Sequence, residues 1–183
     1  MYMSLIKLPS CNTYEQHQAI WTLFPNTPDR KRDHLFRIES DRDGEATALL
    51  QSSTEPKSSD KAKVAQSKPF NTDLKAGGYF KFKLVACPTK RLCRKGESKK
   101  LVEIKDEAEQ VEWLHRKLDG SNVTVTSMDL KVTKGKQNVP SLFVTFEGIL
   151  QVIDAEKTQR LLVMGIGRKK HAGAGLLSLS KAN

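Results

Sequence analysis

The order of predicted elements in residues 79–179 constrains the fold more than any other feature of the sequence. The elements are strand Tyr79–Ala86, a helix between Asp106 and Gly120, strands Val123–Val132 and Leu142–Val152, a helix from Asp154 to about Met164, and strand Leu176–Leu179. Tyr79–Ala86 alternates large apolar residues with lysine, which is typical of a half-buried strand. Asp106 and Asp154 have the side chain that helix N-caps prefer. The helix after Asp106 is predicted to bury an apolar face, Ala108, Val111, Leu114 and Leu118. This order, βαββαβ, is the ferredoxin-like pattern.

The first half of the chain is predicted to be a degraded copy of the same unit. Its elements are a strand at residues 2–8, a helix from Thr13 to about Phe24, and strands His34–Glu39 and Ala46–Gln51. Thr13 and Gln16 fit a capping box, and Asp43-Gly44 predicts a type I′ hairpin turn. Residues 52–63 are predicted to be a loop, and Val64–Leu74 fits no single element. We therefore predict an α+β protein of two tandem ferredoxin-like (RRM-like) domains, at residues 1–85 and 86–183.

Charge and composition point to a polyanionic partner. The 183 residues include 31 Lys+Arg and 21 Asp+Glu, a formal net charge of +10. Such a surplus favours nucleic acid binding. The cysteines, Cys11, Cys87 and Cys93, form neither a disulfide framework nor a metal pair, which fits a reducing cytoplasm. The sequence has no run of 18 apolar residues, so we expect no membrane span.

Two basic segments are candidate RNA contacts. Residues 87–102 are predicted to be a basic loop. Six cations are concentrated there around Gly96: Lys90, Arg91, Arg94, Lys95, Lys99 and Lys100. A second segment combines cations with four glycines, which let backbone approach another surface closely: Gly165, Gly167, Arg168, Lys169, Lys170, Gly173 and Gly175. Its spacing matches neither a Walker A loop nor a dinucleotide fingerprint. The alternative for both segments is a solvated surface loop.

His17 is the candidate proton-transfer residue. It lies one helical turn after Tyr14, on the side of the predicted helix that carries Ile20, Trp21 and Phe24. An imidazole there can exchange a proton near neutral pH. The alternative is a histidine buried in the core with its ring nitrogens satisfied. We find no metal-ligand spacing, so we expect no metal or other cofactor.

Motifs along nearly the whole chain resemble one known family, the CasE-type CRISPR RNA-processing endoribonucleases. The similar stretches are Tyr14-x-x-His17, Trp21-x-Leu23-Phe24-Pro25, Asp29-x-x-Arg32-Asp33-x-Leu35-Phe36, the segment from Lys105 to Leu118, Phe146-Glu147-Gly148, and the glycine-rich end from Gly165 to Leu179. The glycine-rich end is the most specific of these. Residues 40–75 contribute little.

The resemblance implies an activity and a set of partners. The protein would bind the hairpin of a CRISPR repeat transcript and cut at the 3′ base of the stem. It would then stay on the 3′ hairpin, as a single copy beside the backbone subunits of a Cascade-like effector complex in the prokaryotic cytoplasm.

The resemblance also implies a metal-independent mechanism. The 2′-hydroxyl of the RNA would attack the adjacent phosphate, leaving a 2′,3′-cyclic phosphate and a 5′-hydroxyl. His17 would be the general acid/base with Tyr14 beside it, and a lysine near the phosphate would be Lys136 or Lys134. Two alternatives stay open: a subunit that binds the hairpin without cutting it, and a generic basic ferredoxin-like protein.

Overall fold

The computed structural model describes residues 1–71, 73–92, 100–134 and 140–182. The first unit contains β1 (Tyr2–Pro9), α1 (Thr13–Trp21), β2 (His34–Arg42), β3 (Glu45–Ser52) and β4 (Lys63–Pro69). The second unit contains β5 (Tyr79–Ala86), β6 (Thr89–Leu92), β7 (Lys100–Glu103), α2 (Glu107–Lys117), β8 (Ser121–Lys134), β9 (Pro140–Val152), α3 (Ala155–Met164), the 3₁₀ turn η1 (Lys170–Ala172) and β10 (Leu177–Lys181). In the described ranges, no helix is long and apolar enough to cross a membrane.

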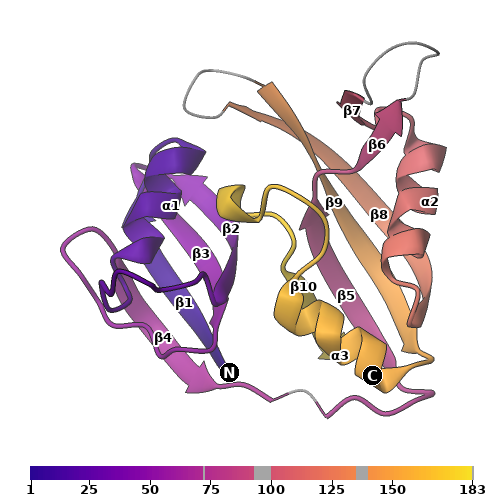
Figure 1. The fold of residues 1–183 in the computed structure, drawn as a ribbon, viewed down its shortest axis with the longest axis horizontal. Coiled ribbons are helices and arrows are strands. Elements are labelled where there is room, and N and C mark those ends of the chain that lie inside the picture. The colour runs from indigo at the N-terminus through magenta and orange to yellow at the C-terminus, as the bar shows by residue number, and fades with distance from the viewer. Residues whose placement is uncertain (72, 93–99, 135–139, 183) are drawn as a thin grey trace.

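Each unit is built on a four-stranded antiparallel sheet, and the two sheets stand side by side (Figure 1). The strand orders are β2-β3-β1-β4 and β10-β5-β9-β8, which place the first strand of each unit beside its third and fourth. The second unit has both crossover helices of the βαββαβ pattern. In the first unit, residues 53–62 replace the second helix by turns. The predicted fold class and the degraded first copy are both confirmed.

The first unit corrects three local predictions. Asn12, and not Thr13, caps α1, and its side chain accepts from the amides of Tyr14 and Glu15 in a capping box. The helix ends at Trp21, three residues before the predicted Phe24. Strand β4 forms in the segment that fitted no single element. The hairpin prediction is confirmed, since Asp43 and Gly44 have φ values of 53° and 79°.

Strand β5 lies within the residues that we assigned to the first domain, and its pairing bears on where the two units meet. Strand β5 pairs with β9 and β10, so it belongs to the second sheet. We expected the first domain to continue to residue 85. We therefore propose that the boundary lies between Pro69 and Tyr79.

Glycine at position 148 allows an irregular pairing of β8 with β9. The register shifts between Val125 and Ser127. A Cβ at Gly148 would lie 2.0 Å from the carbonyl oxygen of Thr124, so no side chain fits there. An irregularity of this kind typically increases the local twist of a strand pair.

Two further elements differ from the sequence prediction. The segment at residues 87–102, expected to be a loop, contains the short β6–β7 hairpin. The buried face of α2 consists of Gln110, Trp113 and Leu114, whereas Ala108, which we expected to be buried, is exposed. Gln110 belongs to the core because its amide donates to the Ile104 carbonyl.

Arg37 of β2 joins the two units. Its guanidinium is buried and donates to the hydroxyl of Ser178 at 3.0 Å and to the carbonyls of Lys83 and Leu176. The same group donates to Glu39 at 2.6 and 2.8 Å. Because its partners lie on strands of both sheets, Arg37 fixes their relative position.

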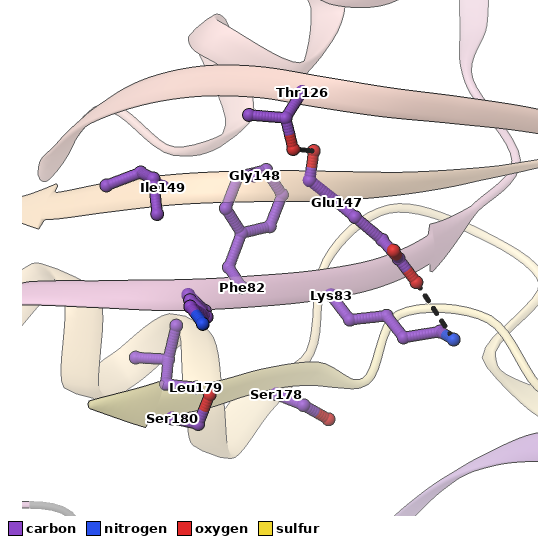
Figure 2. A pocket seen from close by; sticks show the side chains of 10 residues that line it. Phe82, Lys83, Thr126, Glu147, Gly148, Ile149, Ser178, Leu179 and Ser180 are labelled. Atoms are coloured by element: carbon purple, nitrogen blue, oxygen red, sulfur yellow. Dashed lines mark hydrogen bonds and ion pairs between the residues drawn. The ribbon is translucent and has the colours of Figure 1, made fainter. Parts of the chain in front are cut away.

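Two more contacts support this junction. The Lys83 ammonium lies 3.0 Å from Glu147 of the neighbouring strand, as Figure 2 shows, and 3.8 Å from Glu39 of the first unit. The Gln51 amide donates to the Leu162 carbonyl of α3 at 2.7 Å. The segment after α3 then reaches α1 (Figure 1).

Candidate active site

His17 lies on α1 with its ring partly buried. Its Nε2 atom accepts a hydrogen bond from Nε1 of Trp21, one turn later, at 3.1 Å. Its Nδ1 atom is buried and has no hydrogen-bond partner among the described residues. Because Nε2 acts as an acceptor, the proton of the neutral ring belongs on Nδ1. His17 is therefore neither a fully buried core histidine nor, in this conformation, a base with a free lone pair.

The glycine-rich segment brings a second imidazole to His17. The His171 ring, in η1, has its centroid 6.0 Å from that of His17, with the planes inclined at 73°. His171 is exposed, whereas the segment on either side of it is packed into the protein. The site therefore combines a helix of the first unit with a turn of the second.

Cations surround His171 in a shallow pocket. The pocket is lined by Arg32, Gly167, Arg168, Lys169, Lys170 and His171. Lys169 has a φ of 61°, a left-handed conformation that is rare for lysine and common in functional loops. The positive lining suits a phosphate of a nucleic acid backbone.

Burial and positive neighbours keep both imidazoles neutral. Burial, then His171 and Arg32, lower the pKa of His17 below its ordinary value. Burial, then Lys169 and Arg32, lower the pKa of His171 in the same way. Each ring can therefore accept a proton near neutral pH, and an incoming phosphate would make that protonation easier.

A third histidine supports the floor of the site. His34 is buried against Trp21, with ring centroids 5.2 Å apart, and stacks on Phe24 at 5.0 Å. Arg30 also lies over the Phe24 ring, 4.2 Å from the ring centroid, and pairs with Asp33. Burial, with the Arg30 charge adding to it, lowers the pKa of His34 to about 4. This cluster fixes Trp21, and Trp21 in turn contacts the catalytic candidate.

The glycines of the 165–175 segment pack it between the two units. A Cβ at Gly165 would lie 2.7 Å from the Leu35 side chain. One at Gly175 would lie 2.9 Å from the Ile166 carbonyl. Gly173 lies over Phe36, and Gly167 over Trp113. These four positions thus place the cations of the segment, and Lys170 is itself anchored, since its ammonium donates to the Met164 carbonyl at 2.7 Å.

The remaining predicted site residues, besides His17 and the glycine-rich segment, fall into three groups. Tyr14, on the same helix as His17, is partly exposed, and its hydroxyl accepts from the Gln18 amide at 3.0 Å. Lys90, Arg91 and Lys100 lie on the β6–β7 hairpin, away from α1 (Figure 1), and Lys90 pairs with Glu109 of α2. Lys136, Arg94, Lys95, Lys99 and the side chain of Lys134 lie outside the described residues.

Sequence reasoning missed three contributors. Arg32 lines the basic pocket, Trp21 donates to His17, and His34 supports Trp21. Arg32 and His34 flank Asp33 at the start of β2. We noted Arg32 only for its resemblance to the family, and His34 only as the start of a predicted strand. In the described part of the chain, no three His, Cys, Asp or Glu side chains come together as a metal site.

Comparisons with known proteins agree on one family. A family model described as CRISPR associated protein matches residues 7–181. The CRISPR system Cascade subunit CasE of Escherichia coli is 36% identical, over 98% of this chain and 99% of that protein. The CRISPR-associated endoribonuclease Cse3 of Thermus thermophilus is 32% identical, over 92% of this chain and 90% of that protein.

The fold comparison gives the same result. A structure of CRISPR endoribonuclease Cse3 bound to a 19-nucleotide RNA superposes with a TM-score of 0.83 and 30% identity, covering 98% of each chain. The matches run along the entire chain, through both units and the segment that joins them. The chain belongs to the CRISPR-associated protein family, among the CasE and Cse3 endoribonucleases.

Proposed function

We propose that this protein binds the stem-loop of CRISPR repeat transcripts and cuts the RNA at the 3′ base of the stem. It then remains on the 3′ hairpin of the guide RNA as one subunit of a Cascade-like complex in the cytoplasm. The observation that carries the proposal is the placement of His17 beside a turn rich in cations. The relatives named as a Cascade subunit and as an endoribonuclease support the same activity.

The chemistry requires only positioning and proton transfer. The 2′-hydroxyl of the RNA is the nucleophile, and no metal is needed to generate it. His17 takes the proton from this hydroxyl as it attacks, and Tyr14 contacts the same ribose. The cations at Arg32, Arg168 and Lys169 stabilise the charge on the pentacoordinate phosphate. A lysine from the β8–β9 connection, Lys136 or Lys134, adds to this charge.

His17 must exchange its hydrogen-bond partner before it can act. Its Nε2 lone pair is occupied by the Trp21 N–H in the RNA-free structure. When the RNA binds, the 2′-hydroxyl replaces the indole as the group bound to Nε2. The binding of RNA is thus coupled to the activation of the base.

The His17→Ala variant tests this proposal. In EDTA, we expect single-turnover cleavage of a repeat hairpin to be slower by about 10²–10⁴-fold, because one general acid/base is lost. RNA affinity should stay near that of the wild type. His115→Ala is the matched control, since His115 is exposed on α2.

The result also separates the proposal from its alternative. If the wild type at excess over RNA yields no product, the protein is a hairpin-binding subunit without cleavage activity. If His17→Ala cleaves like the wild type, His17 has no part in the reaction.

A further inference from the structure

His171 is a second imidazole that the proposed reaction has not used. Its ring lies 6.0 Å from that of His17, and the two come from different units of the protein. It is exposed and lines the same pocket as Arg32 and Lys169. A side chain in that position faces the space where cations would hold the scissile phosphate.

A single imidazole can carry out only one of the two proton transfers that the reaction requires. Attack by the 2′-oxygen releases a proton, and departure of the 5′-oxygen requires one. A single ring cannot be free of its proton for the first transfer and loaded for the second at the same moment. The surroundings of His17 strengthen this point, because Nδ1 is buried and only Nε2 can face a substrate.

We propose that His171 donates the proton to the departing 5′-oxygen while His17 takes the proton from the 2′-hydroxyl. This inference rests on the proposed function. The O2′–P bond forms as the P–O5′ bond breaks, His17 ends with one more proton and His171 with one fewer. Exchange with solvent restores both rings, so the reaction needs no other reactant.

The charges around the pair suit this division of roles. His171 faces His17 from α1 and Arg32 from the segment before β2, and Lys169 and Lys170 flank it on its own turn. Burial, then Lys169 and Arg32, lower the pKa of His171, which makes its protonated form a stronger proton donor. When the substrate binds, the negative charge of its phosphate raises the pKa of His171 and favours the protonated form of the ring.

A substrate with sulfur at the leaving position gives the decisive experiment. Sulfur departs as a thiolate without protonation, so loss of a general acid does not slow its cleavage. On the ordinary RNA hairpin, His171→Ala should be about 10²-fold slower or more. On the hairpin with a 5′-bridging sulfur, it should match the wild type.

The control variants separate this inference from other effects. His17→Ala should be slow on both substrates, and His115→Ala slow on neither. The pH–rate profile of His171→Ala on ordinary RNA should lose its alkaline limb, while RNA affinity stays unchanged. A merely structural role for His171 would slow both substrates equally.

Two outcomes would overturn the inference. If His171→Ala cleaves ordinary RNA at the wild-type rate, or if the sulfur substrate does not restore its rate, His171 is not the donor. Either result leaves the proposed function intact as long as the wild type cuts in EDTA and His17→Ala does not. Absence of cleavage by the wild type would instead refute the proposed function itself.

Discussion

The two units have the same strand order but different completeness. The second has both crossover helices, and the larger core cluster lies in it. The first has only α1, and turns at residues 53–62 stand in place of its second helix. Yet the reactive candidate, His17, lies on the less complete unit, while His171 and most of the pocket cations come from the other.

The candidate site depends on both units, although one of them is less complete. Neither unit contains the whole site, so its geometry depends on how the units are joined. The junction between the units consists of Arg37, Gln51 and the glycine-rich segment. Changes at this junction should therefore affect both stability and cleavage, whereas changes within one unit and away from the site should affect stability alone.

The Arg37→Ala substitution should weaken the junction between the two units and have the largest effect of the changes considered. Arg37→Ala removes five hydrogen bonds that the buried guanidinium donates to Glu39, to Ser178 and to two carbonyls of the second unit, so we expect a loss of about 3–5 kcal/mol in the free energy of unfolding. Urea unfolding followed by circular dichroism measures it. Cleavage of the repeat hairpin should also slow in the folded fraction.

Arg42→Ala is the control for this change. Arg42 is exposed at the end of the same strand, and its loss should alter stability by less than about 0.5 kcal/mol. Equal stability of the two variants would show that Arg37 does not join the units.

His34 should make the stability of the first unit depend on pH. The folded pKa is about 4, below the ordinary value of 6.5, so the unfolded chain binds a proton that the folded chain does not. Stability should therefore fall as the pH drops from 6.5 to 4, by about 3 kcal/mol in total, and this contribution is lost entirely below pH 4. Denaturant unfolding across this range measures the effect.

The His34→Phe variant isolates that contribution. Phenylalanine keeps the stacking on Phe24 and cannot be protonated, so its stability curve should be flatter between pH 6.5 and 4. His115→Ala should keep the wild-type slope. Parallel curves for His34→Phe and the wild type would contradict the assignment.

The smallest expected effects compare the helix caps of the two units. Asn12→Ala removes the acceptor of two amides in α1, and Asp154→Ala removes the acceptor of the Lys157 amide in α3. We expect each to cost about 1 kcal/mol in the free energy of unfolding. Thermal unfolding measures both, with Asn26→Ala as an exposed control. A cap variant as stable as Asn26→Ala would show that its helix end needs no cap.

The fold was largely predictable because the strands that carry the core alternate clearly. Strands β5, β8 and β9 have strong alternation, and their helices have acidic caps. Strand β4 escaped prediction because six of its seven residues are exposed, which leaves no apolar pattern to detect. The buried face of α2 was wrong at Ala108 because a polar residue, Gln110, fills that place in the core through a hydrogen bond.

The site was only partly predictable, for a different reason. His17, Tyr14 and the glycine-rich segment could be recognised from local spacing. The approach of His171 to His17 could not, because it depends on the junction between two units. Arg32 lines the pocket through a tertiary contact that no spacing in the sequence encodes. The contact of Trp21 with His17 is different, because residues four apart on one helix are neighbours and the spacing alone could have predicted it.

The hydrogen bond between Trp21 and His17 allows the site to be followed by tryptophan fluorescence. Imidazolium quenches indole emission far more than neutral imidazole does, so the fluorescence of Trp21 follows the charge on His17. The chain contains two tryptophans, and Trp113→Phe would leave Trp21 as the sole emitter. In that variant, the arrival of a transcript and the titration of His17 become signals that a fluorimeter can record in real time, with no label attached.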